Sequence, residues 1–286
     1  MNRMTRTFCR WLGLATILGI GAAPTLVVGE EALPKPRVMP ASHVRQAVHP
    51  LDPALKMARA SLHHIQANVH DYSALFVKRC RVDGILPELQ YANVKIRNRK
   101  SRDGNVITPM AAYLGFLKPD SVKGREVIWV EGQNEGNLIA HETGIKGMMN
   151  FHLDPNGYLA MRGQRHPITD IGIENLVAKL IETGERDHQH GECQVQFYQN
   201  AKIGDAPCTM LEVIHPVRRP HFDFYRARVY FDNNLNMPIR YESWSWPTTA
   251  GGEPVLEEEY TYLRVKVNIG LTDRDFDISN PNYRFQ

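Results

Sequence analysis

A long series of segments in which apolar and polar residues alternate constrains this 286-residue chain most strongly. In the clearest segment, near the C-terminus, apolar residues occupy alternate positions at Leu263, Val265, Val267 and Ile269. A period of two is that of a β-strand with one apolar face. Similar segments recur between the sequences RDGN, GQNEG and DPNG, which favour tight turns. The pattern predicts an antiparallel sheet in which most strands pair with the next strand along the chain.

Two further segments predict amphipathic helices. Asp52 and Pro53 suit the start of the first helix, whose apolar stripe runs from Leu55 to Val69. The second helix is expected to be capped by Asp170 and to end at Gly184. A sheet of roughly nine to eleven strands needs a cover on its apolar face, and these helices can provide it. The expected fold is α+β: a single, strongly curved antiparallel sheet, or incomplete barrel, with amphipathic helices on its concave face.

The first 50 residues have the character of an export signal and a linker. Three arginines within the first ten residues precede an apolar run, which is the layout of a secretory signal. Residues 1–29 are therefore expected to be a signal peptide or an uncleaved anchor. Residues 30–50 contain four prolines and predict an extended linker. The folded domain is expected over residues 51–286, in the periplasm or elsewhere in the cell envelope.

The charge balance and the cysteines limit the expected partners. The formal net charge is +3, and without the three N-terminal arginines the basic and acidic residues are equal in number. Such a chain has no overall basic field to attract nucleic acid, so none is expected as a partner. The protein is expected to be a monomer. Cys80, Cys193 and Cys208 follow the signal. An odd number leaves at least one unpaired, and the pairing stays open.

The segment ERDHQHGEC, from Glu185 to Cys193, is the densest cluster of side chains that bind metals. No second ligand pair at a recognised spacing accompanies it, so a solvated loop is expected here. The sequence also contains no nucleophile elbow, phosphate loop or zinc-protease signature. We therefore expect no catalytic residues, no metal site and no cofactor. A metal-dependent hydrolase that uses His188 is the third hypothesis.

Four blocks carry a resemblance to known proteins: DYSALFVKRCRVDG, KGREVIWVEGQNEGNLIAH, QRHPITDIGIENLV and EEYTYLRVKVNIGLTDRDFDISNPNYRF. Over residues 52–286 the chain resembles an uncharacterised family of exported bacterial proteins, a domain of unknown function. That family is similar in architecture to the LolA-like outer-membrane lipoprotein-sorting carriers. The resemblance implies an incomplete barrel whose hydrophobic cavity holds acyl chains. The expected function is non-catalytic binding or carriage of a lipid or lipid-modified ligand. The alternative is an envelope interaction or scaffold protein with a filled core.

A carrier of this kind needs an apolar lining, because an unpaired polar group in an apolar site costs free energy. The predicted lining comes from strands and from the two helices. It consists of Leu62, Ile65, Leu75, Val77, Val94, Ile96, Leu176, Leu180, Leu263, Val265 and Val267. Arg165 and His166 lie just before the second helix and are predicted to meet an anionic head group at the cavity mouth. The alternative for this pair is a simple helix-entry loop. The expected partners are a lipid or lipoprotein ligand and an envelope protein.

Overall fold

The computed structural model of this protein describes residues 49–144, 149–249 and 251–285. Residues 47–286 form one compact unit. The predicted signal peptide lies outside the described residues, and so does the predicted linker except for its last two residues, His49 and Pro50. Within the described ranges, no helix combines the length and the apolar character needed to cross a membrane.

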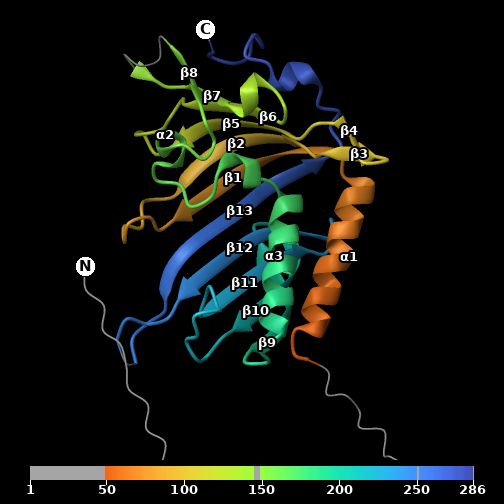
Figure 1. The fold of residues 1–286 in the computed structure, drawn as a ribbon, viewed down its shortest axis with the longest axis vertical. Helices are drawn as coiled ribbons and strands as arrows, with labels where there is room; N and C mark the ends of the chain where they lie inside the picture. Colours follow the sequence, from red (N-terminus) through yellow and green to blue (C-terminus); the bar gives the residue numbers. More distant parts are fainter. Residues whose placement is uncertain (1–48, 145–148, 250, 286) are drawn as a thin grey trace, which may run out of the picture. The chain divides into compact units, whose positions relative to one another are not determined.

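Eleven strands form one antiparallel sheet (Figure 1). From edge to edge they are β8 (Asn150–Leu153), β7 (Leu138–His141), β6 (Glu126–Val130), β5 (Ala111–Lys118), β2 (Gln90–Arg97), β1 (Asp71–Cys80), β13 (Val255–Val267), β12 (Met237–Ser245), β11 (Arg226–Asp232), β10 (Ala206–Ile214) and β9 (Gln194–Ile203). The strands β3 (Lys100–Arg102) and β4 (Asn105–Thr108) form a separate hairpin. Since β8 and β9 are edges, the sheet is not closed into a barrel, and the predicted single antiparallel sheet is confirmed.

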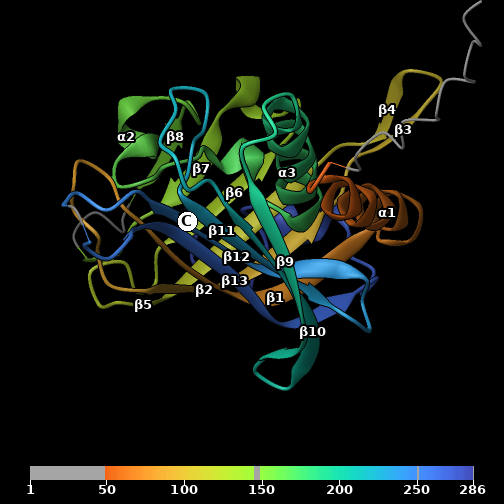
Figure 2. The same ribbon diagram turned by 90° about the horizontal axis from the view of Figure 1, so that it is seen from below.

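The described part of the chain contains few helices. The two long ones are α1 (Asp52–Asn68) and α3 (Ile173–His188), and a single turn forms α2 (Tyr158–Met161). Short 3-10 helices occur at η1 (Asn134–Gly136), η3 (Ile168–Asp170) and η4 (Asp273–Phe276). Side chains of both α1 and α3 pack against β1, β2 and β12, so both helices lie on one face of the sheet, here called the inner face (Figures 1 and 2).

The strand order explains how distant parts of the chain reach the same face. Most neighbouring strands are consecutive in sequence, as the turn sequences predict. The exception that joins the two halves is the pairing of β1 with β13, in which Phe76 lies opposite Tyr262 and Lys78 opposite Tyr260. Residues from both ends of the chain therefore meet in the middle of the sheet.

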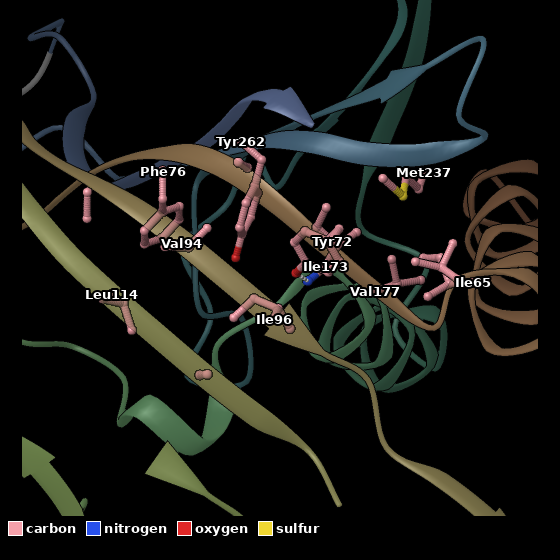
Figure 3. Packing of buried hydrophobic residues seen from close by; sticks show 14 of the residues in the cluster. Ile65, Tyr72, Phe76, Val94, Ile96, Leu114, Ile173, Val177, Met237 and Tyr262 are labelled. Carbon is pink, nitrogen blue, oxygen red and sulfur yellow. Dashed lines mark hydrogen bonds between the residues drawn. The ribbon is translucent and has the colours of Figure 1, made fainter. Parts of the chain in front are cut away.

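Under α1 and the start of α3 the inner face is filled by side chains. Ile65 of α1 and Val177 of α3 are at most 1% exposed, and they belong to one cluster with Tyr72, Val94 and Ile96 of the sheet. Figure 3 shows these side chains pointing toward one another from the two helices and the strands. Burial of each large apolar side chain contributes about 1.5–3 kcal/mol, so this cluster is the main stabilising core of the inner face.

The second helix differs from the prediction at both ends. It begins at Ile173 rather than after Asp170, and two tyrosines of the sheet satisfy its first amides: Tyr72 Oη accepts from the Ile173 amide at 2.8 Å, and Tyr262 Oη from the Gly172 amide at 3.3 Å. The helix also continues through Gly184. A Cβ atom at residue 184 would lie 2.9 Å from Leu55 Cδ2, so this glycine lets α1 and α3 approach closely.

The outer face is partly covered by the C-terminal segment. Phe276 and Phe285 are buried against β5, β6 and β7. Ion pairs hold the segment in place, among them Lys95 Nζ with Asp275 Oδ1 at 2.7 Å. Where the segment leaves β13, the carboxylate of Asp71 accepts hydrogen bonds from the amides of residues 269–271. The basic residues of β2 thus hold the chain's own C-terminal segment instead of forming a free polar surface.

A β-bulge in β13 overturns the simple alternation from which the prediction began. The pairing with β1 shifts register between Ser73 and Leu75, and Arg264 adopts a positive φ of 55°. An extra residue in one strand reverses which face the following side chains occupy. Leu263 therefore points to the outer face, whereas Val265 and Val267 pack toward the inner core.

Candidate functional site

A cavity of about 790 Å³ lies between the inner face of the sheet and α3. Side chains from both halves of the sheet line it, from β7 and β5 on one side to β10 and β11 on the other, so the sheet curves around the hollow. The volume lies within the range of about 300–1,000 Å³ that is typical of small-molecule sites.

Most of the wall is apolar. On the side of β10 and β11, Val213, Ala227, Val229 and Phe231 face the cavity, and they belong to a buried cluster that also includes Leu55 of α1. The opposite wall consists of Leu114, Phe116, Val127, Leu138 and Ala140. The aromatic rings of Phe76 and Tyr262, which lie side by side in Figure 3 with centroids 4.7 Å apart, also line the cavity. These positions are held by β-ladders, so the wall does not depend on a ligand for its shape.

Polar residues gather where β1 ends and β6 and β13 begin. They include Lys78, Arg125, Gln164, Arg165 and His166, which all line the cavity. Their position follows from the sheet: Lys78 lies opposite Tyr260, and Arg125 directly precedes β6. The cavity thus combines a large apolar wall with a group of polar side chains at this edge, here called the polar rim, which suits a molecule with an apolar body and a polar end.

The predicted head-group residues Arg165 and His166 lie on this rim but already have partners. His166 Nε2 lies 2.8 Å from Glu258 Oε2, and Arg165 Nη1 lies 3.1 Å from Glu257 Oε2. Burial alone would raise the pKa of Glu258, but its contacts with His166, Arg165 and Tyr260 outweigh this and lower the pKa. A charged Glu258 therefore offsets much of the positive charge that these residues would offer to an anion.

Lys78 is the rim residue that the sequence analysis missed. It follows Tyr72, Ala74 and Phe76 at alternate positions of β1, all buried on the inner face, so its side chain points into the cavity. Its ammonium donates to Oε1 of Gln164. Burial is the main cause that lowers the pKa of Lys78, and the positive charge of Arg125 acts in the same direction. The sequence contained a signal for this residue, because Lys78 is the only cation at the alternate positions of β1 that also hold Tyr72 and Phe76.

Of the thirteen residues predicted to meet a ligand, four line the cavity: Leu176, Leu180, Arg165 and His166. The core cluster or its partly buried neighbours include Leu62, Ile65, Val94, Ile96, Val265 and Val267, and none of these six lines the cavity. Leu75, Val77 and Leu263 lie on the outer face, because they alternate with the inward Phe76 and Tyr262. These nine residues therefore lie outside the cavity beneath α3.

The histidines of the predicted loop do not converge. His188 is still in α3, and its Nε2 lies 2.8 Å from Asp52 Oδ1, whereas His190 stacks on His221 with ring centroids 3.7 Å apart. Within the described ranges, no three His, Cys, Asp or Glu side chains are grouped so that they could hold a metal ion. Cys80, Cys193 and Cys208 are all free thiols.

Comparison with known proteins places the chain in a family. The model of the family described as "Protein of unknown function (DUF1571)" matches residues 69–285. The chain belongs to this family. No curated protein matches the sequence.

Several solved structures are similar to this one at low sequence identity. The lipoprotein LppX of Mycobacterium tuberculosis is 14% identical, with a TM-score of 0.42 over 79% of this chain and 100% of that one. A putative outer membrane lipoprotein-sorting protein domain from Vibrio parahaemolyticus is 11% identical, with a TM-score of 0.37 over 78% of this chain and 95% of that one. A LolA superfamily protein from Nitrosomonas europaea is 11% identical, with a TM-score of 0.31 over 77% of this chain and 97% of that one.

Proposed function

We propose that this member of the DUF1571 family binds a hydrophobic ligand, an acyl chain or a molecule that carries one, in the cavity beneath α3, and that it does so without catalysis. The observation that carries the proposal is the 790 Å³ cavity itself, with its continuous apolar wall. Burial of about ten methylene groups there would contribute about 8 kcal/mol, enough to offset much of the entropy lost on association.

The location of this activity is proposed from the N-terminal sequence. The basic start and the apolar run that follows it have the layout of an export signal. A protein that shields an acyl chain from water would serve in an aqueous compartment such as the periplasm, since exposed apolar surface is unfavourable there. The filled-core alternative does not fit the hollow half of the inner face.

Extraction of the purified protein tests the proposal. The protein should be prepared from its own cells without detergent, denatured in organic solvent, and the extract analysed by mass spectrometry. We expect acyl-containing compounds to co-purify with the protein and to be absent from the Leu176→Trp variant, in which a larger side chain enters the cavity. An extract free of acyl compounds, together with no uptake of added fatty acid, would contradict the proposal.

A further inference from the structure

We propose that the ligand is an amphiphile with an anionic head group, a phosphate or a carboxylate, and that Lys78 binds that group at the polar rim of the cavity. The inference rests on the proposed function and adds the chemistry of the ligand's polar end.

Lys78 differs from the other cations of the cavity wall in having no carboxylate partner among the residues that the structure describes. Arg165 and His166 contact Glu257 and Glu258. In the same wall, Lys179 Nζ lies 2.9 Å from Glu182 Oε2, and Arg125 Nε lies 2.9 Å from Glu142 Oε1. Lys78 has instead a neutral amide, that of Gln164. Its charge is therefore available to a ligand.

The hydrogen-bonding capacity at this position is also unused. An ammonium group has three donors, and the bond to Gln164 uses one of them. The two remaining donors of this ammonium match an oxyanion, which accepts several hydrogen bonds at once.

The partial burial of Lys78 would strengthen its interaction with an anionic head group. The side chain is half-buried beside Phe76 and Phe116, where an unpaired charge is unfavourable. An anion at this site would restore the electrostatic interactions that the ammonium loses on leaving water. The alkyl chain of the same ligand would then extend along the apolar wall formed by Leu114, Val127 and Ala140.

Competition against a neutral fluorescent probe, N-phenyl-1-naphthylamine, tests the inference with ligands of one chain length. The competitors are dodecyl phosphate, dodecanoate and dodecanol, with inorganic phosphate as a chain-free anion. For the wild-type protein we expect the two anionic amphiphiles to compete at least about tenfold more strongly than dodecanol, as charge-assisted hydrogen bonds imply. Inorganic phosphate should not displace the probe at the same concentrations.

Variants at Lys78 decide whether this residue is responsible. Lys78→Met should reduce the preference for anionic competitors to about twofold and leave dodecanol unchanged, while Lys78→Arg should keep the preference, since it retains the charge. Lys202→Met, which removes an exposed charge on β9 away from the cavity, is the matched control and should behave as wild type. Thermal unfolding of each variant confirms that it is folded.

The outcomes separate the two claims. A Lys78→Met protein that is folded and keeps the full anionic preference overturns the inference but leaves hydrophobic binding intact. Displacement of the probe by inorganic phosphate as effectively as by dodecyl phosphate also overturns it, because the alkyl chain would then play no part. Failure of the wild-type protein to bind the probe or any amphiphile contradicts the proposed function itself.

Discussion

The inner face of the sheet is filled on one side of α3 and hollow on the other. Val177 and Leu176 are neighbours on this helix, yet Val177 is fully buried among Ile65, Tyr72 and Ile96, whereas Leu176 lines the cavity. On the filled side α1 and α3 both press against the sheet, and their side chains interdigitate. On the hollow side, Ala54 and Leu55 of α1 and Leu176 and Leu180 of α3 border the cavity. The same helix thus stabilises the fold with one stripe and lines the cavity with the next.

The largest expected difference between the filled side and the hollow side is in the free energy of unfolding that a truncated side chain costs. Ile96→Ala should lower the free energy of unfolding by about 3 kcal/mol, because it leaves a void in the packed core. Leu176→Ala should cost less than about 1 kcal/mol, because its side chain already borders empty space. Urea unfolding of both variants measures the two values, and equal losses would show that the two halves are packed alike.

The opposite change, from a small to a large side chain, should affect the two sides in opposite ways. Val177→Phe is expected to cost about 2 kcal/mol through overpacking. Leu176→Phe should leave the unfolding free energy nearly unchanged and weaken binding of N-phenyl-1-naphthylamine, because the new ring occupies the cavity. A Leu176→Phe protein that binds the probe as wild type does would argue against the cavity as its site.

A buried histidine beside the hollow half should make stability depend on pH. Burial lowers the pKa of His215 to about 4, and its Nε2 lies 3.5 Å from Asp187 Oδ2. Between the ordinary histidine pKa and this value the unfolded chain binds more protons, so stability falls as the pH falls through this window. From pH 7 to pH 5.5 the expected loss is about 1 kcal/mol.

The control for this pH effect is His215→Gln, which cannot titrate. Its unfolding free energy should change less than that of the wild type over the same pH range. Carboxylates whose pKa is lowered in the folded protein, such as Glu258, also contribute to the free energy of unfolding. That contribution is lost only when the pH falls to about 4 or below, near their ordinary pKa and outside this window. An identical pH profile in both proteins would assign the effect to other groups.

The smallest expected effect concerns Lys78. Because this ammonium is partly desolvated without a carboxylate partner, Lys78→Met should raise the unfolding free energy slightly, by about 0.5 kcal/mol. Lys202→Met should have no measurable effect, since its charge is exposed. A destabilised Lys78→Met protein would indicate that the lysine is part of the packed structure instead of a binding group.

The sheet could be predicted from the sequence because alternation and turn sequences are local signals. Strands such as β2, where Ala92, Val94 and Ile96 face the core, follow the pattern directly. The bulge at Arg264 could not be predicted, because one extra residue leaves no clear mark in composition yet reverses the faces around it. As a result Tyr260 and Tyr262 line the cavity, whereas Leu263, which the alternation placed with Val265, points to the outer face.

The two ends of α3 also could not be predicted from the sequence, because contacts with residues far away in the chain determine them. Hydroxyl groups of Tyr72 and Tyr262, far away in sequence, satisfy its first amides, so Asp170 is not needed as a cap. The local sequence predicts a helix end at Gly184, but this glycine lies inside α3 and leaves room for the Leu55 side chain. Whether the inner face is filled or hollow depends on the distance between the sheet and the helices. Apolar residue types alone do not determine that distance, so the cavity could not be located from the sequence.

The most direct test of the account is the stoichiometry of N-phenyl-1-naphthylamine binding to the delipidated protein, measured by fluorescence titration. We expect saturable uptake of about one probe per chain, displaced by dodecyl phosphate and reduced in the Leu176→Phe variant. Uptake that never saturates, or that is the same in Leu176→Phe, would place the probe on the surface and contradict a ligand-binding cavity beneath α3.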